Sequence, residues 1–176
     1  MPESLAPLGL LRGETPRLRD EPAAGDRAAV RELTSATGFF SDEEVAVAVE
    51  LVEARLAQGL ASGYRFFFAD GDGGLEGYVC YGPIALTKSS FDLYWIAVRP
   101  GAQRAGLGRR LMDAAEAGAR ELGATAMYAE TSSRPQYAPT RTFYRRLGYR
   151  PAAELPDFYG PGDGQVIFEK RLRSGP

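Results

Sequence analysis

The segment from Val98 to Leu111 constrains this chain more than any other, because it joins a strand-like run to a helix-like run through a short loop rich in glycine and arginine. Residues 93–98 before it are apolar, rich in aromatic and β-branched side chains and followed by Pro100, which predicts a buried strand. The apolar residues after it recur at helical spacing and predict a helix of about four turns: Leu107, Leu111, Ala115, Ala119 and Leu122.

This strand–loop–helix segment is suited to an anion. A strand that enters a helix through such a loop directs several free backbone N–H groups at one point, and the helix dipole adds positive charge there. A phosphate or pyrophosphate is the expected ligand. The loop lacks the Gly-Lys-Ser or Gly-Lys-Thr of a Walker A loop, and Gly106-Leu107-Gly108 lacks the third glycine of a dinucleotide fingerprint. The alternative is an ordinary strand–helix turn whose arginines serve solubility.

The composition excludes several other kinds of site. The 176 residues suffice for one domain with a sizeable core, and the net charge of -2 argues against a nucleic-acid partner. Histidine is absent and Cys80 is the single cysteine, so a Ser-His-Asp triad, a Cys-His pair, an internal disulfide and a metal centre built on these ligands are all excluded. No apolar run has transmembrane length, and residues 1–13 lack the basic start of a signal peptide. We therefore expect a cytoplasmic protein with no membrane partner and no metal.

The rest of the chain predicts a single domain over residues 15–173 after a loose N-terminal tail, residues 1–14. Ser41 and Glu44 form a capping box that begins one helix. The expected strands are 17–19, 64–69, 75–84, 93–98, 124–131, one that begins at Tyr149, and 166–172. The expected helices are 26–38, 41–59, 107–122 and 140–147, and residues 155–164 are expected to form a long loop.

Asp92 opens the central strand. A strict period of two places it on one face with Tyr94, Ile96 and Val98. An acid at the head of a buried strand lies at its exposed end or takes part in chemistry, and both readings stay open.

Two motifs in this order resemble one enzyme family. The pattern Gln103-x-x-Gly106-x-Gly108 resembles the acyl-CoA pyrophosphate loop of the GCN5-related N-acetyltransferases (GNAT), and residues 143–149, Phe-Tyr-Arg-Arg-Leu-Gly-Tyr, resemble the signature that closes their coenzyme site. The resemblance covers the order of elements from about Leu75 to Leu172, and the front half matches only coarsely. It implies an α/β (α+β) fold with a mixed, mostly antiparallel sheet of about six to seven strands, flanked by about four helices.

The resemblance also implies a coenzyme site and catalytic residues. Acetyl-CoA is the implied co-substrate, and Tyr144 matches the position whose hydroxyl faces its sulfur. In some members a glutamate near the position of Asp92 is the general base, and aspartate is one methylene shorter. The implied coenzyme-binding residues are Ile96, Ala97, Val98, Gln103, Arg104, Ala105, Gly106, Leu107, Gly108, Arg109, Thr131 and Phe143.

The reaction implied is direct attack of a primary amine on the acetyl thioester. At pH 7 only about one in 10³ molecules of an alkyl amine is neutral, since its pKa is about 10.4, so a base must collect a proton. Asp92 as base and Asp92 as an anchor for the ammonium group are both open. Candidate acceptor-binding residues, in the aromatic loops and on the second core strand, are Phe39, Phe40, Glu130, Asp157, Phe158 and Tyr159.

The favoured acceptor is a small cationic amine. The alternatives are a module that binds acyl-CoA without catalysis, an enzyme of another phosphate ligand such as a nucleotide kinase, and acetylation of a protein N-terminus or lysine. Exposed strand edges leave a homodimer open.

Overall fold

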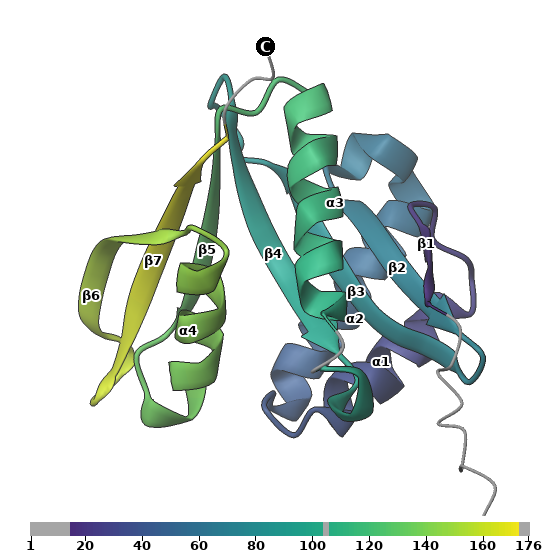
Figure 1. The fold of residues 1–176 in the computed structure, drawn as a ribbon, viewed down its shortest axis with the longest axis horizontal. Coiled ribbons are helices and arrows are strands. Elements are labelled where there is room, and N and C mark those ends of the chain that lie inside the picture. Colours follow the sequence, from purple (N-terminus) through teal and green to yellow (C-terminus); the bar gives the residue numbers. More distant parts are fainter. Residues whose placement is uncertain (1–14, 104–105, 173–176) are drawn as a thin grey trace, which may run out of the picture.

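The computed structural model describes residues 15–103 and 106–172, so the expected tail 1–14 lies outside the described residues. Seven strands form one sheet in the order β1-β2-β3-β4-β5-β7-β6, and only the β4–β5 pair is parallel (Figure 1). This confirms the expected mostly antiparallel sheet with four helices. The strands are β1 Arg17–Arg19, β2 Arg65–Gly71, β3 Gly74–Pro83, β4 Ser90–Val98, β5 Ala126–Ser132, β6 Arg150–Gly160 and β7 Asp163–Arg171.

The α-helices cover both faces of the sheet, and each side has its own core. They are α1 Asp26–Ala36, α2 Asp42–Gln58, α3 Leu107–Glu121 and α4 Ala138–Arg146, with 3₁₀ turns η1 Gly59–Ser62, η2 Pro100–Ala102 and η3 Pro135–Tyr137. The larger core holds buried residues of α3, β5 and β7, such as Leu111, Met127 and Phe168. The other core packs α1 and α2 on β2 and β3, around Val30, Val52 and Phe66. In the described part of the chain, no helix has the length and apolarity to cross a membrane.

The helix signals in the sequence are mostly accurate. The capping box of Ser41 and Glu44 is present at the start of α2. Asp26 is the first residue of α1, where the sequence also predicts that this helix begins. Its buried carboxylate accepts hydrogen bonds of 2.7 and 2.6 Å from Arg19, which also binds Asp70, so these ion pairs join β1 to α1 and β2.

The expected long loop at residues 155–164 is wrong. Most of it belongs to β6, which pairs with β7 and makes an edge of the sheet. Every β6 residue from Arg150 to Tyr159 is exposed, so the strand shows no alternation of apolar and polar residues that a sequence pattern would detect. Pro151 and Pro156 lack an N–H donor, which reduces the capacity of this edge to pair with another strand.

β4 contains an irregularity that changes which side chains share a face. Trp95 lies opposite Cys80 and Leu93 lies opposite Tyr81, so Tyr94 is an extra residue on β4. The expectation that Tyr94 lies on the same face as Ile96 and Val98 is therefore wrong. Tyr94 packs on the core of α1 and α2, whereas Ile96 and Val98 pack on that of α3.

β4 and β5 separate beyond this irregularity. Their parallel pairing runs from Ser90 and Ala126 to Leu93 and Ala129 and goes no further. Figure 1 shows the two strands diverging, with β5, β7, β6 and α4 on one side of the opening and the rest of the fold on the other. The second half of β4 therefore has one strand neighbour, β3.

Candidate active site

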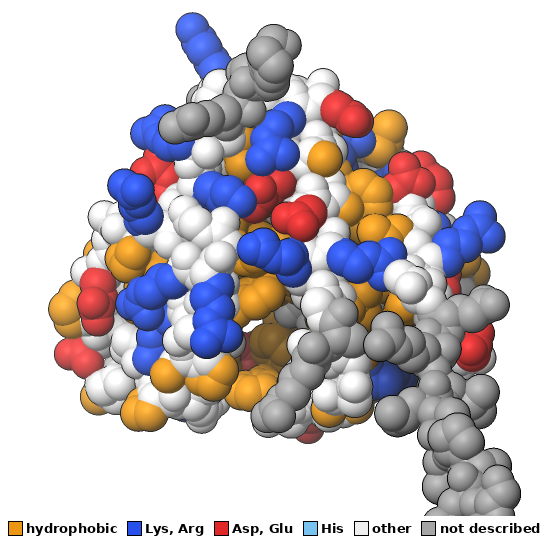
Figure 2. All heavy atoms as spheres, viewed as in Figure 1, with side chains coloured by type: hydrophobic (Ala, Val, Ile, Leu, Met, Phe, Trp, Pro, Cys, Tyr) orange, Lys and Arg blue, Asp and Glu red, His pale blue; other side chains and the backbone are white. Residues whose placement is uncertain are grey.

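The opening between β4 and β5 is a cleft of about 870 Å³. In Figure 2 the surface is hollowed between the region of α4 and the start of α3, with apolar side chains inside and Lys and Arg side chains above it on this face. The cleft lies between the two halves of the sheet. The residues that line it are Thr37, Phe39, Phe40, Ser41, Glu43, Glu44, Asp92, Leu93, Tyr94, Trp95, Ile96, Gln103, Glu130, Thr131, Ser132, Arg134, Tyr137, Thr140, Tyr144, Tyr159 and Asp163.

The free edge of β4 presents backbone groups to this cleft. The N–H of Arg99 donates to the carbonyl of Glu76 on the β3 side, 2.7 Å away. Residues of an antiparallel pair alternate between bonding to the partner strand and turning away from it. Ala97 therefore bonds to β3, while Ile96 and Val98 direct their N–H and C=O groups toward the opening. An extended ligand can add to this edge as a further strand would.

The predicted anion loop lies at the end of this edge. Gly106 has a φ of 78°, a left-handed conformation that favours glycine, and α3 begins at the next residue with no side-chain cap. The first backbone N–H groups of α3, from Leu107 to Arg109, lack partners within the helix. Gln103 reaches back and donates to the Val98 carbonyl at 3.2 Å. Arg104 and Ala105 lie outside the described residues.

Leu107, Gly108 and Phe143 have structural roles as well. The side chain of Leu107 is buried in the core, so only its backbone is available to a ligand. A Cβ added to Gly108 would lie 3.3 Å from the ring of Phe143. This glycine therefore permits the close approach of α3 and α4 at the loop.

Asp92 lies on the wall of the cleft, half-buried at the last stretch where β4 and β5 still pair. Burial raises the pKa of its carboxyl to about 6, and the negative charge of Glu130 acts in the same direction. Both effects disfavour the ionised form. Asp92 is therefore a stronger base than an exposed aspartate, and it is still mostly ionised at pH 7.

Tyr144 lies on α4 across the cleft from β4. Its ring is buried against Phe143, Tyr149 and Phe168, with centroid distances of 5.8, 5.8 and 5.5 Å. Burial raises the pKa of its hydroxyl well above the ordinary value. Within the described residues this hydroxyl has no hydrogen-bond partner, so it is a protonated donor at the cleft.

The structure brings most of the predicted acceptor-binding residues together, with two exceptions. Phe39, Phe40, Glu130 and Tyr159 line the cleft, as does Thr131. Phe40 packs on Trp95 with ring centroids 4.9 Å apart. Asp157 and Phe158 do not line it. The Asp157 carboxylate instead accepts a hydrogen bond from the N–H of Gly162 in the β6–β7 turn, and Phe158 is 56% exposed.

Several cleft residues were not predicted from the sequence. Tyr137 donates from its hydroxyl to the Phe39 carbonyl at 3.3 Å and fixes that loop over the cleft. Arg134 pairs with Asp163 at 3.0 Å. Their signal in the sequence is weak, because they lie in an irregular segment after β5 and at the start of β7, where no motif marks them.

Carboxylates dominate the charged lining of the cleft. Glu43, Glu44, Asp92, Glu130 and Asp163 contribute five, against the single guanidinium of Arg134. In residues 15–103 and 106–172 no cluster of three metal-ligating side chains occurs. The cleft therefore attracts cations at one end, while the loop and α3 present positive groups at the other.

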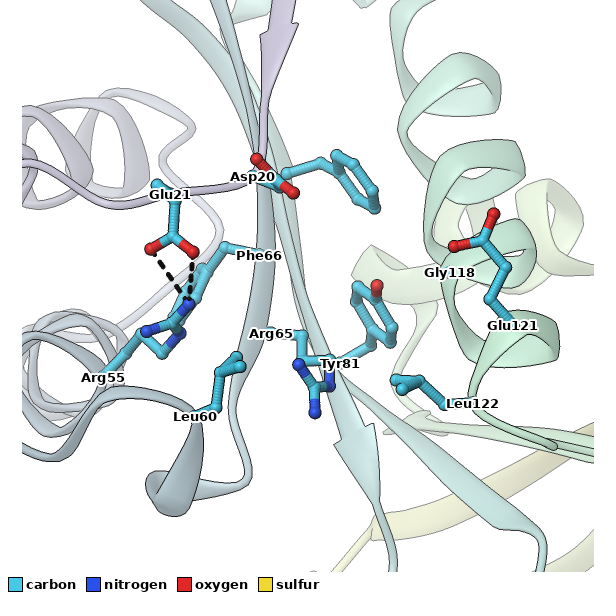
Figure 3. A pocket seen from close by; sticks show the side chains of 11 residues that line it. Asp20, Glu21, Arg55, Leu60, Arg65, Phe66, Tyr81, Gly118, Glu121 and Leu122 are labelled. Carbon is cyan, nitrogen blue, oxygen red and sulfur yellow. Dashed lines mark hydrogen bonds and ion pairs between the residues drawn. The ribbon is translucent and has the colours of Figure 1, made fainter.

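A second cavity of about 220 Å³ lies between α2 and α3 on another part of the molecule (Figure 3). Arg55, which is buried, donates to both carboxylate oxygens of Glu21 at 2.9 and 3.0 Å, and Figure 3 shows this pair at one side of the cavity. None of the predicted site residues lines it. This ion pair joins α2 to the segment that follows β1.

Comparison with known proteins supplies the family. A model described as "Acetyltransferase (GNAT) domain" matches residues 62–151, just over half of the chain. A crystal structure of a GNAT-family acetyltransferase from Desulfovibrio desulfuricans is 43% identical, with a TM-score of 0.87 over 89% of this chain and 99% of that one. The blasticidin-S acetyltransferase of Streptomyces morookaense is 42% identical over 101 residues, which are 57% of this chain and 65% of that relative's length.

More distant structures share the fold. An aminoglycoside 6'-N-acetyltransferase in complex with coenzyme A is 16% identical, with a TM-score of 0.71 over 91% of this chain and 99% of that one. The family model and the Desulfovibrio structure together carry the assignment: the chain belongs to the GNAT family of acetyltransferases.

Proposed function

We propose that the chain is an N-acetyltransferase that moves an acetyl group from acetyl-CoA to a primary amine of a small cationic molecule, by direct attack of the amine on the thioester. The observation that carries this proposal is the cleft itself. One continuous opening runs past the free edge of β4, Asp92 and Tyr144, next to the uncapped start of α3.

In this proposal the coenzyme enters along β4. Ile96 and Val98 hold the pantetheine arm through their outward N–H and C=O groups, and Ala97 spaces them. Gln103 and the backbone N–H groups of Gly106 to Arg109 hold the pyrophosphate, with Arg104 and Ala105 completing the loop. Thr131 lines the opposite wall, and the ring of Phe143 packs beside Gly108 at the start of α3. Acetyl-CoA supplies the activated acetyl group.

Asp92 acts as the base. The acceptor arrives as an ammonium ion, and holding it neutral at pH 7 costs about 4.6 kcal/mol for a pKa of about 10.4. A carboxylate with a pKa near 6 takes up that proton more readily than one with an ordinary pKa. The negative charge of the Asp92 carboxylate also attracts the ammonium ion before the proton is transferred. The same side chain therefore serves as anchor and as base.

Tyr144 assists the leaving thiolate. Full proton transfer from a phenol of pKa about 10 to a thiolate whose acid has pKa about 8.5 is uphill by about 2 kcal/mol. Burial increases this difference, because it raises the pKa of Tyr144. The proposed role is therefore a hydrogen bond to the sulfur that strengthens as charge develops there.

A small cationic acceptor is supported by the lining and by the relatives. The acceptor end has five carboxylates beside the aromatic side chains of Phe39, Phe40 and Tyr159. The names of two similar proteins refer to acetylation of blasticidin S and of aminoglycosides. The cationic end of an amine and an apolar or ring-shaped body both find complementary surface here.

The test is an acetylation assay of the full chain with acetyl-CoA and a panel of amino acids, polyamines, aminoglycosides, nucleoside antibiotics and peptides, with release of free thiol as the readout and mass spectrometry of the product. Turnover with a small amine supports the proposal. Binding of coenzyme A with no turnover on any acceptor would favour a binding module. Modification confined to proteins of a lysate would favour a protein N-terminus or lysine.

A further inference from the structure

The buried side-chain amide of Gln165 contacts Glu130, a carboxylate that lines the same cleft as Asp92. Gln165, on β7, is 5% exposed and does not itself line the cleft. Its Nε2 donates to Glu130 Oε2 at 2.6 Å and to the Tyr159 hydroxyl at 3.3 Å. Both donors of the amide nitrogen are thus directed at groups that line the cleft.

The strand register explains why Gln165 reaches Glu130. Ser132 of β5 lies directly opposite Gln165, and Glu130 is two residues earlier on the same face. The amide therefore fixes the exposed carboxylate of Glu130 at the wall of the cleft. Asp92 and Glu130 both line the cleft, and Asp92 lies opposite Tyr128, two residues before Glu130 on β5.

Two other carboxylates of the cleft are already engaged. Asp163 pairs with Arg134, and Glu44 accepts from the N–H of Ser41 at the start of α2. In the part of the chain that the structure describes, neither Asp92 nor Glu130 has a cationic partner. A bound molecule with two positive groups would form an ion pair with Asp92 and another with Glu130.

We propose that Gln165 is a specificity-determining positioning residue, which holds Glu130 so that it binds a second cationic group of the acceptor while the reacting amine lies at Asp92. The acceptor class is then a diamine, or an amine that also carries a guanidinium group. The kinetic test of this inference rests on the proposed function, because it measures acetyl transfer. The binding test does not, because it measures only the affinity for the amine.

The experiment compares 1,3-, 1,4- and 1,5-diaminoalkanes with the monoamines of equal length. Calorimetric titrations use the wild-type chain and the Gln165→Met and Glu130→Gln variants, each saturated with coenzyme A. The wild-type chain should bind at least one diamine about tenfold more tightly than its monoamine, as expected for one charged hydrogen-bonded contact. Glu130→Gln should abolish this preference, and Gln165→Met should reduce it about fivefold or more through weaker binding of the diamine.

Kinetics with acetyl-CoA separate positioning from general damage. In Gln165→Met the loss should appear in KM for the diamine, with kcat for the monoamine within about twofold of wild type. The exposed Gln136, outside the cleft, provides the matched control: Gln136→Met makes the same chemical change and should leave the preference intact.

Two results would overturn the inference: a wild-type chain that binds diamines and monoamines equally, or a Gln165→Met variant that keeps the full preference. A clear diamine preference in binding without any acetyl transfer would leave this inference standing and would contradict the proposed function instead.

Discussion

Asp92 and Tyr144 are both ionisable side chains that the fold buries, and burial raises the pKa of each. The consequences differ because the ordinary pKa is about 3.8 for an aspartate and about 10 for a tyrosine. At pH 7 to 8 the carboxyl of Asp92 is mostly ionised and the hydroxyl of Tyr144 is protonated. These are the protonation states that a base and a hydrogen-bond donor need at the start of the reaction.

Replacing Tyr144 by Phe removes the hydroxyl and keeps the ring that packs on Phe143, Tyr149 and Phe168. We expect kcat to fall at least about tenfold, as for loss of a general acid or donor, with acetyl-CoA affinity nearly unchanged. Tyr149→Phe is the control, since it removes a neighbouring buried hydroxyl that has no hydrogen-bond partner in the described residues. An unchanged kcat in Tyr144→Phe, measured by thiol release, would remove the proposed role.

Replacing Asp92 by Asn tests the base through pH dependence. In the wild type, kcat/KM should rise about tenfold per pH unit below pH 6 and level off above it, because the carboxyl must be ionised to accept the proton. In Asp92→Asn this break should disappear and kcat should fall. A variant with higher KM and unchanged kcat would assign the residue to anchoring of the ammonium ion.

The same variant has a stability signature whose sign follows from the raised pKa. The native state holds the Asp92 proton more tightly than the unfolded state, so ionisation destabilises the fold as pH rises from about 3.8 to about 6, and the cost is complete above that. Asp92→Asn should therefore have a higher Tm than wild type at pH 8. That difference should shrink as pH falls below 6 and vanish well below pH 3.8, where both states of the wild type are protonated.

Prediction of single residues from the sequence depended on whether a local signal existed. Asp92 and Tyr144 were assigned to the cleft because one begins a recognisable strand and the other lies in a recognisable motif, and both line it. The face shared by Tyr94 was predicted wrongly, since one extra residue in β4 resets the alternation. Gln165 carried no signal, because a buried glutamine in a strand is marked only by what it contacts across the sheet.

At the scale of elements, the turn from β4 to α3 combines a strand with a free edge, a left-handed glycine and an uncapped helix start. Its sequence was informative because strand, turn and helix each have strong local patterns. The start of β6 agrees with the strand expected from Tyr149, but its second part, residues 155–160, was missed for the opposite reason. β6 is exposed along its length and contains two prolines, so its pairing with β7 rather than its own composition makes it a strand.

Gly106 tests this turn directly. Its φ of 78° strains any side chain, although an added Cβ would meet no atom of the described residues within 4 Å. Gly106→Val should fold and should lower acetyl-CoA affinity about tenfold or more, because the side chain occupies the approach to the helix start. Gly101→Val is the matched control, since Gly101 has an ordinary φ and equal space. Equal affinities in calorimetry would contradict the assignment of the loop.

At the scale of the whole molecule, four paired positions of β4 and β5 join the two halves of the sheet on either side of the cleft. The sequence resemblance predicted this fold class, but the front half, from β1 to α2, was placed only as a set of elements. Its packing depends on long-range contacts such as Arg19 with Asp70, which no local pattern reveals.

A ligand that spans the cleft should stabilise both halves together. At 100 times its Kd, acetyl-CoA should add about 2.7 kcal/mol to the free energy of unfolding and raise Tm by about 5–10 °C. ATP at the same concentration should have a much smaller effect, since it lacks the pantetheine arm that pairs with β4. A larger shift with ATP would favour a nucleotide-dependent enzyme.

Hydrogen exchange can locate that stabilisation within β4. In the free protein the N–H groups of Ile96 and Val98 face the cleft and should exchange rapidly, while the N–H of Ala97 bonds to β3 and should be protected. Coenzyme A should slow exchange at Ile96 and Val98 at least about tenfold and change Ala97 much less. Because the three residues are consecutive, general stiffening of the fold would slow all three and cannot produce this alternation. Uniform slowing, or none, would contradict the pairing of the coenzyme with the β4 edge even if the coenzyme binds.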